Sequence, residues 1–309
     1  MIMLKVSKLV KRYGDNLAVS DISFSVSPGE IYGLLGPNGA GKSTTINIIT
    51  GLIRKDGGTV TIDGLDLDKS LQQAKHLLGI VPQDLAIYND LTAYQNVSFF
   101  GALYGLKGAA LKRQAMETLA LVGLEDKAKS KVKTFSGGMK RRLNIACGLV
   151  HRPKILILDE PTVGIDPQSR NHIMESILKL NKEGMTIVYT THYMEEAEQL
   201  CNRIAIMDMG QIVAQGNLSE LRGLIEEHWF INLKVKGMPP LEDLRGVSGV
   251  EQIDVSGNVL RFRCSNKNSQ LRSILDILAE HHIEILDLAT EEPNLEDVFL
   301  TLTGKRLRD

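Results

Sequence analysis

Short apolar runs alternate with amphipathic stretches along the N-terminal, larger part of the chain. Residues 31–35 and 186–190 have the length and composition of buried strands, and apolar positions at helical spacing over 167–182 predict a helix. Strands that alternate with helices predict an α/β fold with a mostly parallel sheet covered on both faces. The predicted strands are 4–10, 17–26, 31–35, 59–62, 77–81, 154–158, 186–190, 203–208 and 211–214, and the predicted helices are 44–52, 167–182 and one from near Met139, with helical character over about 91–123.

The pattern changes after Gly223, where strand-like stretches dominate. Ser256-Gly257-Asn258 is a turn signal ahead of the predicted strand 259–264. We therefore expect a small α+β domain over residues 224–309, after a larger domain over residues 1–223. The predicted strands of the small domain are 230–235, 250–255, 259–264 and 283–288, and its predicted helices are 270–280 and 295–302.

Composition narrows the class of protein. The 309 residues can form one large and one small domain, and the formal net charge of −1 argues against nucleic acid as a partner held by bulk charge. No run approaches the roughly 18 apolar residues that span a bilayer, and the first residues lack the pattern of a signal peptide. The three widely spaced cysteines indicate a reduced setting, and Cys147 is expected to pack in the core. We expect a cytoplasmic chain.

Residues 36–44, Gly-Pro-Asn-Gly-Ala-Gly-Lys-Ser-Thr, satisfy the phosphate-loop pattern G-x-x-x-x-G-K-[ST] between a predicted strand and a predicted helix. The glycines let the backbone turn its N–H groups toward a phosphate, and the helix N-terminus adds partial positive charge. We expect Lys42 to reach the β- and γ-phosphates of a nucleoside triphosphate and Ser43 to ligate Mg²⁺. The residues of this loop expected at the nucleotide are Gly36, Asn38, Gly39, Gly41, Lys42, Ser43 and Thr44.

Two acids follow the apolar strand around residues 155–158. An acid at the carboxyl end of a parallel strand faces the ligand crevice, so Asp159 is placed to hold Mg²⁺, directly or through water. Glu160 is then placed to act as the general base toward the attacking water. A solvated strand end is the alternative, and the nearby phosphate loop argues against it.

A second glycine-rich step, Ser136-Gly137-Gly138, enters the helix predicted from near Met139. Such a step is expected to bind an anion as the phosphate loop does, because its backbone N–H groups and the helix N-terminus attract negative charge. Because the chain has a single phosphate loop, the second step is expected to serve another subunit, with an ordinary helix cap as the alternative. The basic residues that follow, Lys140, Arg141 and Arg142, are expected to be a solvent-exposed helix start rather than a nucleic-acid patch.

These motifs, in this order, resemble the ATP-binding cassette (ABC) ATPases over roughly residues 4–221. The resemblance implies a P-loop NTPase fold with an antiparallel β part and a helical subdomain at about residues 84–150. It assigns Tyr13 to adenine stacking, and it assigns Gln83 to the loop that touches Mg²⁺ and the membrane partner. Asp166 then lies in the loop that crosses the dimer interface, and His192 is the switch histidine at the γ-phosphate.

The resemblance also assigns the remaining roles. Ser136, Gly137 and Gly138 correspond to the signature loop, although Phe135 and Met139 stand where leucine and glutamine are common. The catalytic residues that it implies are Lys42, Gln83, Glu160 and His192, and the residues at Mg²⁺ are Ser43, Gln83 and Asp159.

The tail over residues 291–304 resembles the ending of ATPases that serve ABC-2-type exporters, which include drug and antibiotic resistance systems. The expected function is therefore an ATP-binding and hydrolysing exporter subunit. A homodimer would sandwich two ATP molecules and drive separate membrane permease subunits at the inner face of the cell membrane. The alternatives are an importer ATPase and a soluble cassette ATPase that acts on nucleic acid or ribosomes. The near-neutral charge and the single cassette argue against the latter.

Overall fold

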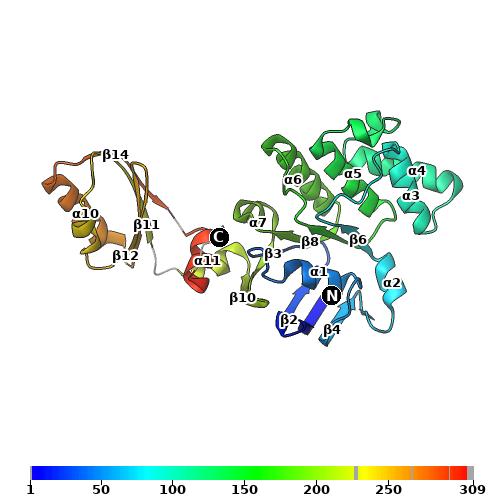
Figure 1. The fold of residues 1–309 in the computed structure, drawn as a ribbon, viewed down its shortest axis with the longest axis horizontal. Coiled ribbons are helices and arrows are strands. Elements are labelled where there is room, and N and C mark those ends of the chain that lie inside the picture. Colours follow the sequence, from blue (N-terminus) through cyan, green and yellow to red (C-terminus); the bar gives the residue numbers. More distant parts are fainter. Residues whose placement is uncertain (1, 226–228, 266, 292, 305–309) are drawn as a thin grey trace. The chain divides into compact units, whose positions relative to one another are not determined.

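The computed structural model describes residues 2–225, 229–265, 267–291 and 293–304 (Figure 1). The chain divides into two compact units, with the break between Leu218 and Ser219. Within these residues the first unit has two sheets and the second has one, and each unit has its own hydrophobic core. Among the described residues, no helix is long and apolar enough to cross a membrane.

The centre of the first unit is a six-stranded sheet in the order β10-β9-β3-β8-β7-β6. Five neighbouring strands run parallel, and only β10 is antiparallel to its neighbour. The strands are β3 (Ile31–Leu35), β6 (Leu78–Val81), β7 (Ile155–Asp159), β8 (Thr186–Thr191), β9 (Arg203–Asp208) and β10 (Gln211–Gly216).

Every residue of β3, β7 and β8 is buried, which explains why these strands read as continuous apolar runs. Successive side chains point to opposite faces of the sheet. Leu156 and Leu158 pack into a core with the helices, whereas Ile155 and Ile157 pack into a core shared with the antiparallel sheet. The carboxyl ends of these strands lie at one edge, where ligands bind in open α/β sheets.

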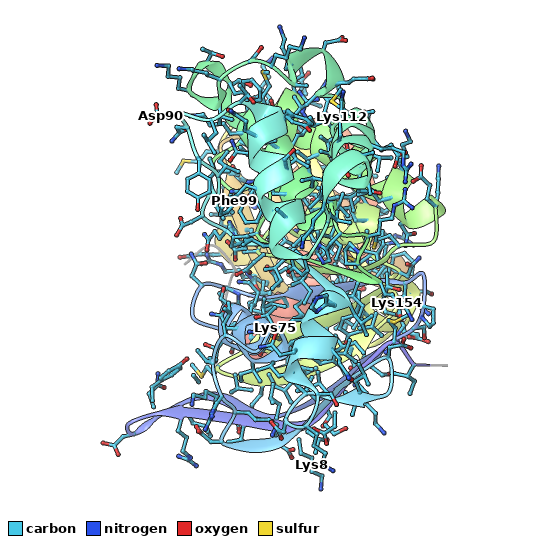
Figure 2. The ribbon with its side chains drawn as sticks, turned by 90° about the vertical axis from the view of Figure 1, so that its right-hand side faces the viewer. Lys8, Lys75, Asp90, Phe99, Lys112 and Lys154 are labelled. Carbon is cyan, nitrogen blue, oxygen red and sulfur yellow. The ribbon has the colours of Figure 1, made fainter. Side chains whose placement is uncertain are left out.

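The antiparallel sheet of this unit has the order β2-β1-β4-β5. Its strands are β1 (Leu4–Tyr13), β2 (Asn16–Val26), β4 (Gly57–Ile62) and β5 (Leu65–Asp66). The helices are α1 (Lys42–Ile49), α2 (Leu71–His76), α3 (Ala93–Leu103), α4 (Gly108–Leu121), α5 (Gly137–Leu149), α6 (Pro167–Lys182) and α7 (Met194–Leu200), with α8 (Leu218–Gly223) at the break between the units. Short 3₁₀ turns occupy Glu125–Lys127 and Val132–Thr134. In Figure 2, Phe99 on α3 and Lys112 on α4 lie among the helices in the upper part of the view. Lys75 on α2 and Lys8 on β1 lie below them.

The second unit has the strand and helix order β-α-β-β-α-β and ends in one further helix. Its antiparallel sheet has the order β12-β13-β11-β14. One face, with Leu233 and Phe262, packs on the helices through Ile274 and Leu244. The elements are β11 (Trp229–Lys236), α9 (Leu241–Arg245), β12 (Val250–Ser256), β13 (Val259–Cys264), α10 (Lys267–Glu280), β14 (Glu284–Glu291) and α11 (Leu295–Thr303).

Most predicted elements are present with shifts of a few residues at their ends. The predicted helix 44–52 begins earlier, at Lys42, and ends at Ile49. The helical stretch expected over 91–123 is two helices, which separate near Gly105, where φ is +86°. Five short elements were not predicted, namely β5, α2, α7, α8 and α9. Cys147 is buried in the core, as expected.

Candidate functional site

The phosphate loop connects β3 to α1, as the sequence predicts. Gly41 caps α1 with φ at +99°, in the left-handed region that glycine favours. A Cβ at this position would lie 2.6 Å from the carbonyl oxygen of Ala18, so a side chain is also excluded by the neighbouring strand. The backbone path of the loop therefore depends on glycine at this point.

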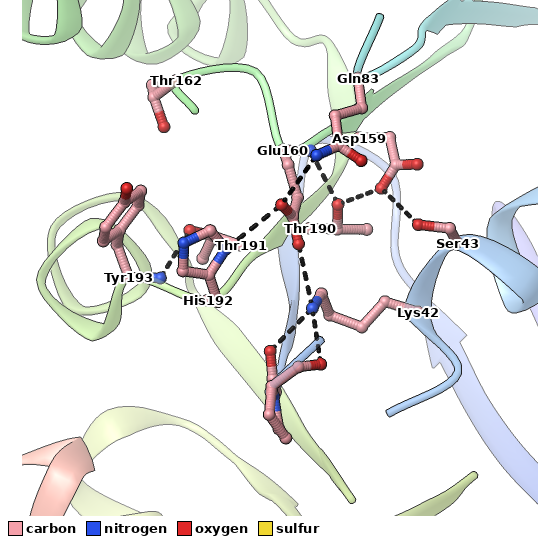
Figure 3. A network of polar contacts seen from close by, with 12 residues as sticks. Lys42, Ser43, Gln83, Asp159, Glu160, Thr162, Thr190, Thr191, His192 and Tyr193 are labelled. Atoms are coloured by element: carbon pink, nitrogen blue, oxygen red, sulfur yellow. Dashed lines mark hydrogen bonds and ion pairs between the residues drawn. The ribbon is translucent and has the colours of Figure 1, made fainter. Parts of the chain in front are cut away.

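Lys42 lies at the base of this loop and is buried. Its Nζ donates hydrogen bonds to the carbonyl oxygens of Gly36 at 2.7 Å and Pro37 at 3.1 Å (Figure 3). The same atom lies 3.0 Å from Oε1 of Glu160, which is equally buried. The ammonium group is thus held beside the loop and is neutralised by an acid from the end of β7.

Glu160 is the centre of the polar network in Figure 3. Its Oε2 lies 3.2 Å from Nδ1 of His192 and accepts a hydrogen bond from Nε2 of Gln83 at 3.5 Å. Its φ of +45° is unusual for a residue with a side chain, and its N–H donates to the hydroxyl of Thr190 at 2.9 Å. This strained turn brings a lysine, a histidine and a glutamine to one carboxylate.

Asp159 supplies the other carboxylate at the end of β7. Its Oδ1 accepts hydrogen bonds from the Thr190 hydroxyl at 2.5 Å and from the Ser43 hydroxyl at 3.5 Å. Carboxylate and hydroxyl oxygens are ligands that suit Mg²⁺. In the described residues there is no group of three or more His, Cys, Asp and Glu side chains placed to hold a metal. The donor set fits an ion that takes few protein ligands and the rest from phosphates and water, which is the usual manner of Mg²⁺.

A cavity of about 690 Å³ opens above the phosphate loop. Of the predicted site residues, those that line it are Tyr13, Asn38, Gly39, Gly41, Lys42, Ser43, Thr44, Gln83 and Glu160. Tyr13 ends β1 with half of its surface exposed. Lining residues that sequence reasoning missed are Asn16, Leu17, Ala18, Met209 and Gly210. They belong to two hairpin turns or adjoin them, and the short gap between the predicted strands 203–208 and 211–214 indicates a turn there but not a ligand.

The second glycine-rich step lies elsewhere on the first unit. The Ser136 hydroxyl caps α5 and accepts a hydrogen bond from the N–H of Met139 at 3.3 Å. A Cβ added at Gly138 would overlap the side chain of Ser169 in the first turn of α6. Of the described residues that line the cavity, none is from Ser136 to Gly138, and Asp166 is not among them either.

Asp166 caps α6 immediately before Pro167. Its Oδ1 accepts a hydrogen bond from the N–H of Ser169 at 2.9 Å, and this bond holds the pKa of the carboxyl below its usual value. Because Ser169 also neighbours Gly138, the Ser136 step and the Asp166 cap form one continuous region of the surface, and both Ser136 and Asp166 are exposed.

The expectation for Arg141 is wrong. This arginine is buried, and it donates hydrogen bonds to the carbonyl oxygens of Pro82 at 2.9 Å and Gln83 at 2.7 Å. Lys140 and Arg142 are partly buried, and Arg142 donates to the carbonyl oxygen of Val122 at 3.1 Å. A guanidinium can be buried when its donors find acceptors, and here these are carbonyls distant in sequence.

A phosphate loop between β3 and α1, with two acids at the end of β7, which lies beyond β8 in the same parallel sheet, defines a P-loop nucleoside triphosphatase. Comparison with known families matches residues 19–163 to "ABC transporter" and residues 216–303 to "ATP-binding protein DrrA1-3-like, C-terminal domain".

Known relatives match nearly the whole chain, and two of them illustrate this. The linearmycin resistance ATP-binding protein LnrL of Bacillus subtilis is 47% identical and aligns over 99% of this chain and 100% of its own length. A Nod factor export ATP-binding protein I of Ralstonia nicotianae is 38% identical over 99% of this chain and 95% of its own length.

Solved structures of ABC cassettes resemble the larger part of the chain. The cbiO1 structure from Clostridium perfringens has a TM-score of 0.66 at 32% identity, over 70% of this chain and 88% of its own. A dimeric cassette, MJ0796 bound to ADP and Pi, has a TM-score of 0.63 at 29% identity, over 70% of this chain and 98% of its own. The chain therefore belongs to the ABC transporter family. It is an ATP-binding and ATP-hydrolysing subunit of an ABC exporter, and the alternatives left open by the sequence are not favoured.

Proposed function

We propose that two copies of this chain close around two ATP molecules and that closure and hydrolysis drive export through separate membrane subunits. The observation that carries this proposal is the separation of the two anion-binding steps in one chain. The loop from Gly36 to Thr44 lines the cavity, whereas Ser136 to Gly138 lies outside it. A second copy is the simplest source of the missing half, and the dimeric relative bound to ADP and Pi supports this arrangement.

In this proposal the residues around the cavity divide the work by their chemistry. Lys42 binds the β- and γ-phosphates, and Ser43, Asp159 and Gln83 hold Mg²⁺, which neutralises phosphate charge. Tyr13 stacks on the adenine, since it lies exposed at the rim of the cavity.

Glu160 is the proposed general base, and His192 contacts the γ-phosphate. Lys42 is paired with Glu160 in the described structure. When the phosphates of ATP pair with the Lys42 ammonium group in place of Glu160, the Glu160 carboxylate becomes available to accept a proton from the attacking water. The contact from Nδ1 of His192 keeps the carboxylate oriented during this exchange.

The second glycine-rich step completes the site from the partner copy. Ser136, Gly137 and Gly138 begin α5, and the N-terminus of this helix presents N–H groups and partial positive charge to an anion. Asp166 lies in the same region of the surface and is proposed to cross the interface between the copies. The domain limits at residues 223 and 224, and the helical subdomain at about 84–150, remain predictions.

The names of the relatives support export, since one is a linearmycin resistance ATP-binding protein and another is a Nod factor export ATP-binding protein. We therefore propose efflux of a resistance-type substrate, with the chain at the inner face of the membrane through its permease. The proposed contact with the permease is the region after Gln83. Its Tyr88 and Phe99 are exposed, and their ring centroids are 5.2 Å apart.

The test is Glu160→Gln. The amide keeps the size of the side chain but cannot accept the proton, so hydrolysis is expected to fall by at least about 100-fold. An ATP-bound dimer should accumulate and elute early in gel filtration with ATP and Mg²⁺, and after detergent extraction it should co-purify with the membrane subunits. The control is Glu183→Gln, an exposed acid at the end of α6. A Glu160→Gln protein that stays monomeric with saturating ATP would contradict the dimer proposal.

A further inference from the structure

A second buried carboxylate lies behind the switch histidine. Glu196 is on α7 and has only 2% of its surface exposed. Three hydroxyl groups donate to it, namely Thr162 at 2.6 Å, Tyr189 at 2.8 Å and Thr191 at 2.8 Å. The two oxygens of a carboxylate have enough lone pairs to accept all three of these hydrogen bonds.

The charge of this carboxylate is also compensated. Nε of Arg170 lies 3.5 Å from Oε1 of Glu196, and the same guanidinium lies 4.5 Å from the ring centroid of Tyr193. Burial, and next the negative charge of Glu196, raise the pKa of Tyr189 well above its usual value, so this phenol keeps its proton and remains a donor. The three hydroxyls and the guanidinium therefore surround one buried carboxylate, and each contact restrains the others.

The partners of Glu196 come from the two segments that carry predicted switch residues. Thr162 starts the loop that leads from Glu160 to Asp166, and Arg170 is in the first turns of the helix that Asp166 caps. Tyr189 and Thr191 end β8, directly before His192. The Thr191 hydroxyl also accepts a hydrogen bond from the N–H of Tyr193 at 2.9 Å, which fixes the backbone on the other side of His192.

We propose that Glu196 is a positioning residue that ties the loop carrying Asp166 to the turn carrying His192. The inference rests on the proposed dimer, in which Asp166 is the residue that meets the second copy. A displacement of the Asp166 loop is passed through Thr162 and Arg170 to the carboxylate, and from there through Thr191 to His192 and Glu160. Hydrolysis then depends on closure of the dimer, because the histidine is held in place only when the loop is.

The decisive variant is Glu196→Gln, with Glu195→Gln as its matched control. Both changes remove one negative charge from neighbouring residues of the same helix, but Glu195 is exposed. We expect Glu196→Gln to lower kcat for ATP about tenfold, which is within the range of coupling between sites, while KM changes less than about twofold. Glu195→Gln should leave both constants unchanged. A role in folding alone would lower the melting temperature and leave kcat per folded molecule intact.

Two further measurements keep the inference testable. If Glu196→Gln does not fold, Thr162→Val removes one hydroxyl without changing the shape of the side chain, and it should lower kcat about threefold at constant KM. The double variant Thr162→Val/Glu196→Gln should be no slower than Glu196→Gln alone, because both changes interrupt one connection. Unchanged kcat in Glu196→Gln, or in Thr162→Val where the former does not fold, would overturn the inference.

Failure of the dimer proposal is recognised separately. The Glu160→Gln protein reports dimer formation without using Glu196. If Glu160→Gln forms the ATP-bound dimer and Glu196→Gln hydrolyses ATP at the normal rate, the role of Glu196 alone is refuted. If Glu160→Gln never dimerises, the proposed function fails first and the role of Glu196 is refuted with it.

Discussion

The two glycine-rich steps of the first unit have similar local chemistry and different surroundings. Gly36 to Thr44 and Ser136 to Gly138 each place glycine at the N-terminus of a helix that can receive an anion. Around the first step, the side chains of Lys42, Asp159 and Glu160 converge from separate elements. Around the second, the Ser136 hydroxyl caps its own helix and Gly138 packs on Ser169.

This difference shows that a helix N-terminus becomes a catalytic site only where other elements bring charged groups to it. Beside the second step the acid of another element, Asp166, already caps its own helix, and the Ser136 hydroxyl already accepts the Met139 N–H. Ser136 and Gly137 are exposed, which leaves this helix start accessible to a ligand held by another copy. The two steps therefore differ in what they are expected to serve: ATP binding needs the first, and hydrolysis also needs the second.

The largest effect is expected for Lys42→Ala in the first step. Loss of the ammonium group removes charge-assisted hydrogen bonds to phosphate worth about 3 kcal/mol in total, so ATP should bind at least about 100-fold more weakly. It also removes the ammonium partner of the buried Glu160, which keeps its contacts with His192 and Gln83, and this loss should lower the free energy of unfolding by about 3 kcal/mol. Isothermal titration calorimetry and chemical denaturation measure the two quantities.

Two controls separate binding from stability in that experiment. Lys42→Ala/Glu160→Gln removes the buried negative charge that has lost its ammonium partner, so stability should recover while ATP binding stays lost. Lys112→Ala, on the exposed surface of α4 (Figure 2), should change neither quantity. Wild-type affinity for ATP in Lys42→Ala would contradict the assignment of the first step as the phosphate site.

A smaller and more selective effect is expected for Gly137→Ala in the second step. A Cβ at this position meets only Cδ1 of Ile165, at an ordinary 3.8 Å, so the isolated chain should fold normally. In the proposed dimer the new methyl group lies at the phosphates of the partner's ATP. Hydrolysis should then fall about tenfold with ATP binding unchanged, because the lost contacts are made only in the closed state.

Gly138→Ala is the matched comparison, since its Cβ would overlap Ser169 and disturb packing in the single chain as well. It should lower both stability and hydrolysis, whereas Gly137→Ala should lower hydrolysis alone. Normal turnover in Gly137→Ala, measured by phosphate release at saturating ATP, would mean that the second step does not face a nucleotide.

The sequence predicted what is local and missed what depends on packing between distant elements. The phosphate loop and the strands β3, β7 and β8 are recognisable because glycine spacing and fully buried apolar runs are contiguous in sequence. Arg141 was misjudged because its acceptors are the carbonyls of Pro82 and Gln83, which only the fold brings near. A charged residue in a polar stretch gives no local sign that it will be buried.

Glu196 illustrates the same limit on a finer scale. Glu195 and Glu196 are adjacent acids on a helix of seven residues, which is too short for a clear apolar period. One is exposed, and the other accepts hydrogen bonds from three hydroxyls on two other segments. The pairing of Lys42 with Glu160 was likewise not predicted, although both residues were placed in the site, because the two were assigned to different reaction partners.

The smallest effect is expected for Tyr13→Ala, at the rim of the cavity above the first step. Half of this side chain is exposed, and the Nζ of Lys11 lies 5.5 Å from its ring centroid, so the ring contributes little to folding. Stacking of an aromatic ring on a base contributes about 1 kcal/mol, so ATP should bind about fivefold more weakly while kcat stays the same. Tyr13→Phe keeps the ring and should bind ATP like the wild type, which attributes the effect to stacking and not to the hydroxyl. An equal loss of affinity in both variants would instead indicate a hydrogen bond from the phenol to the nucleotide. Unchanged affinity in both would mean that the neighbouring turns at Leu17 and Met209 contact the adenine in place of Tyr13.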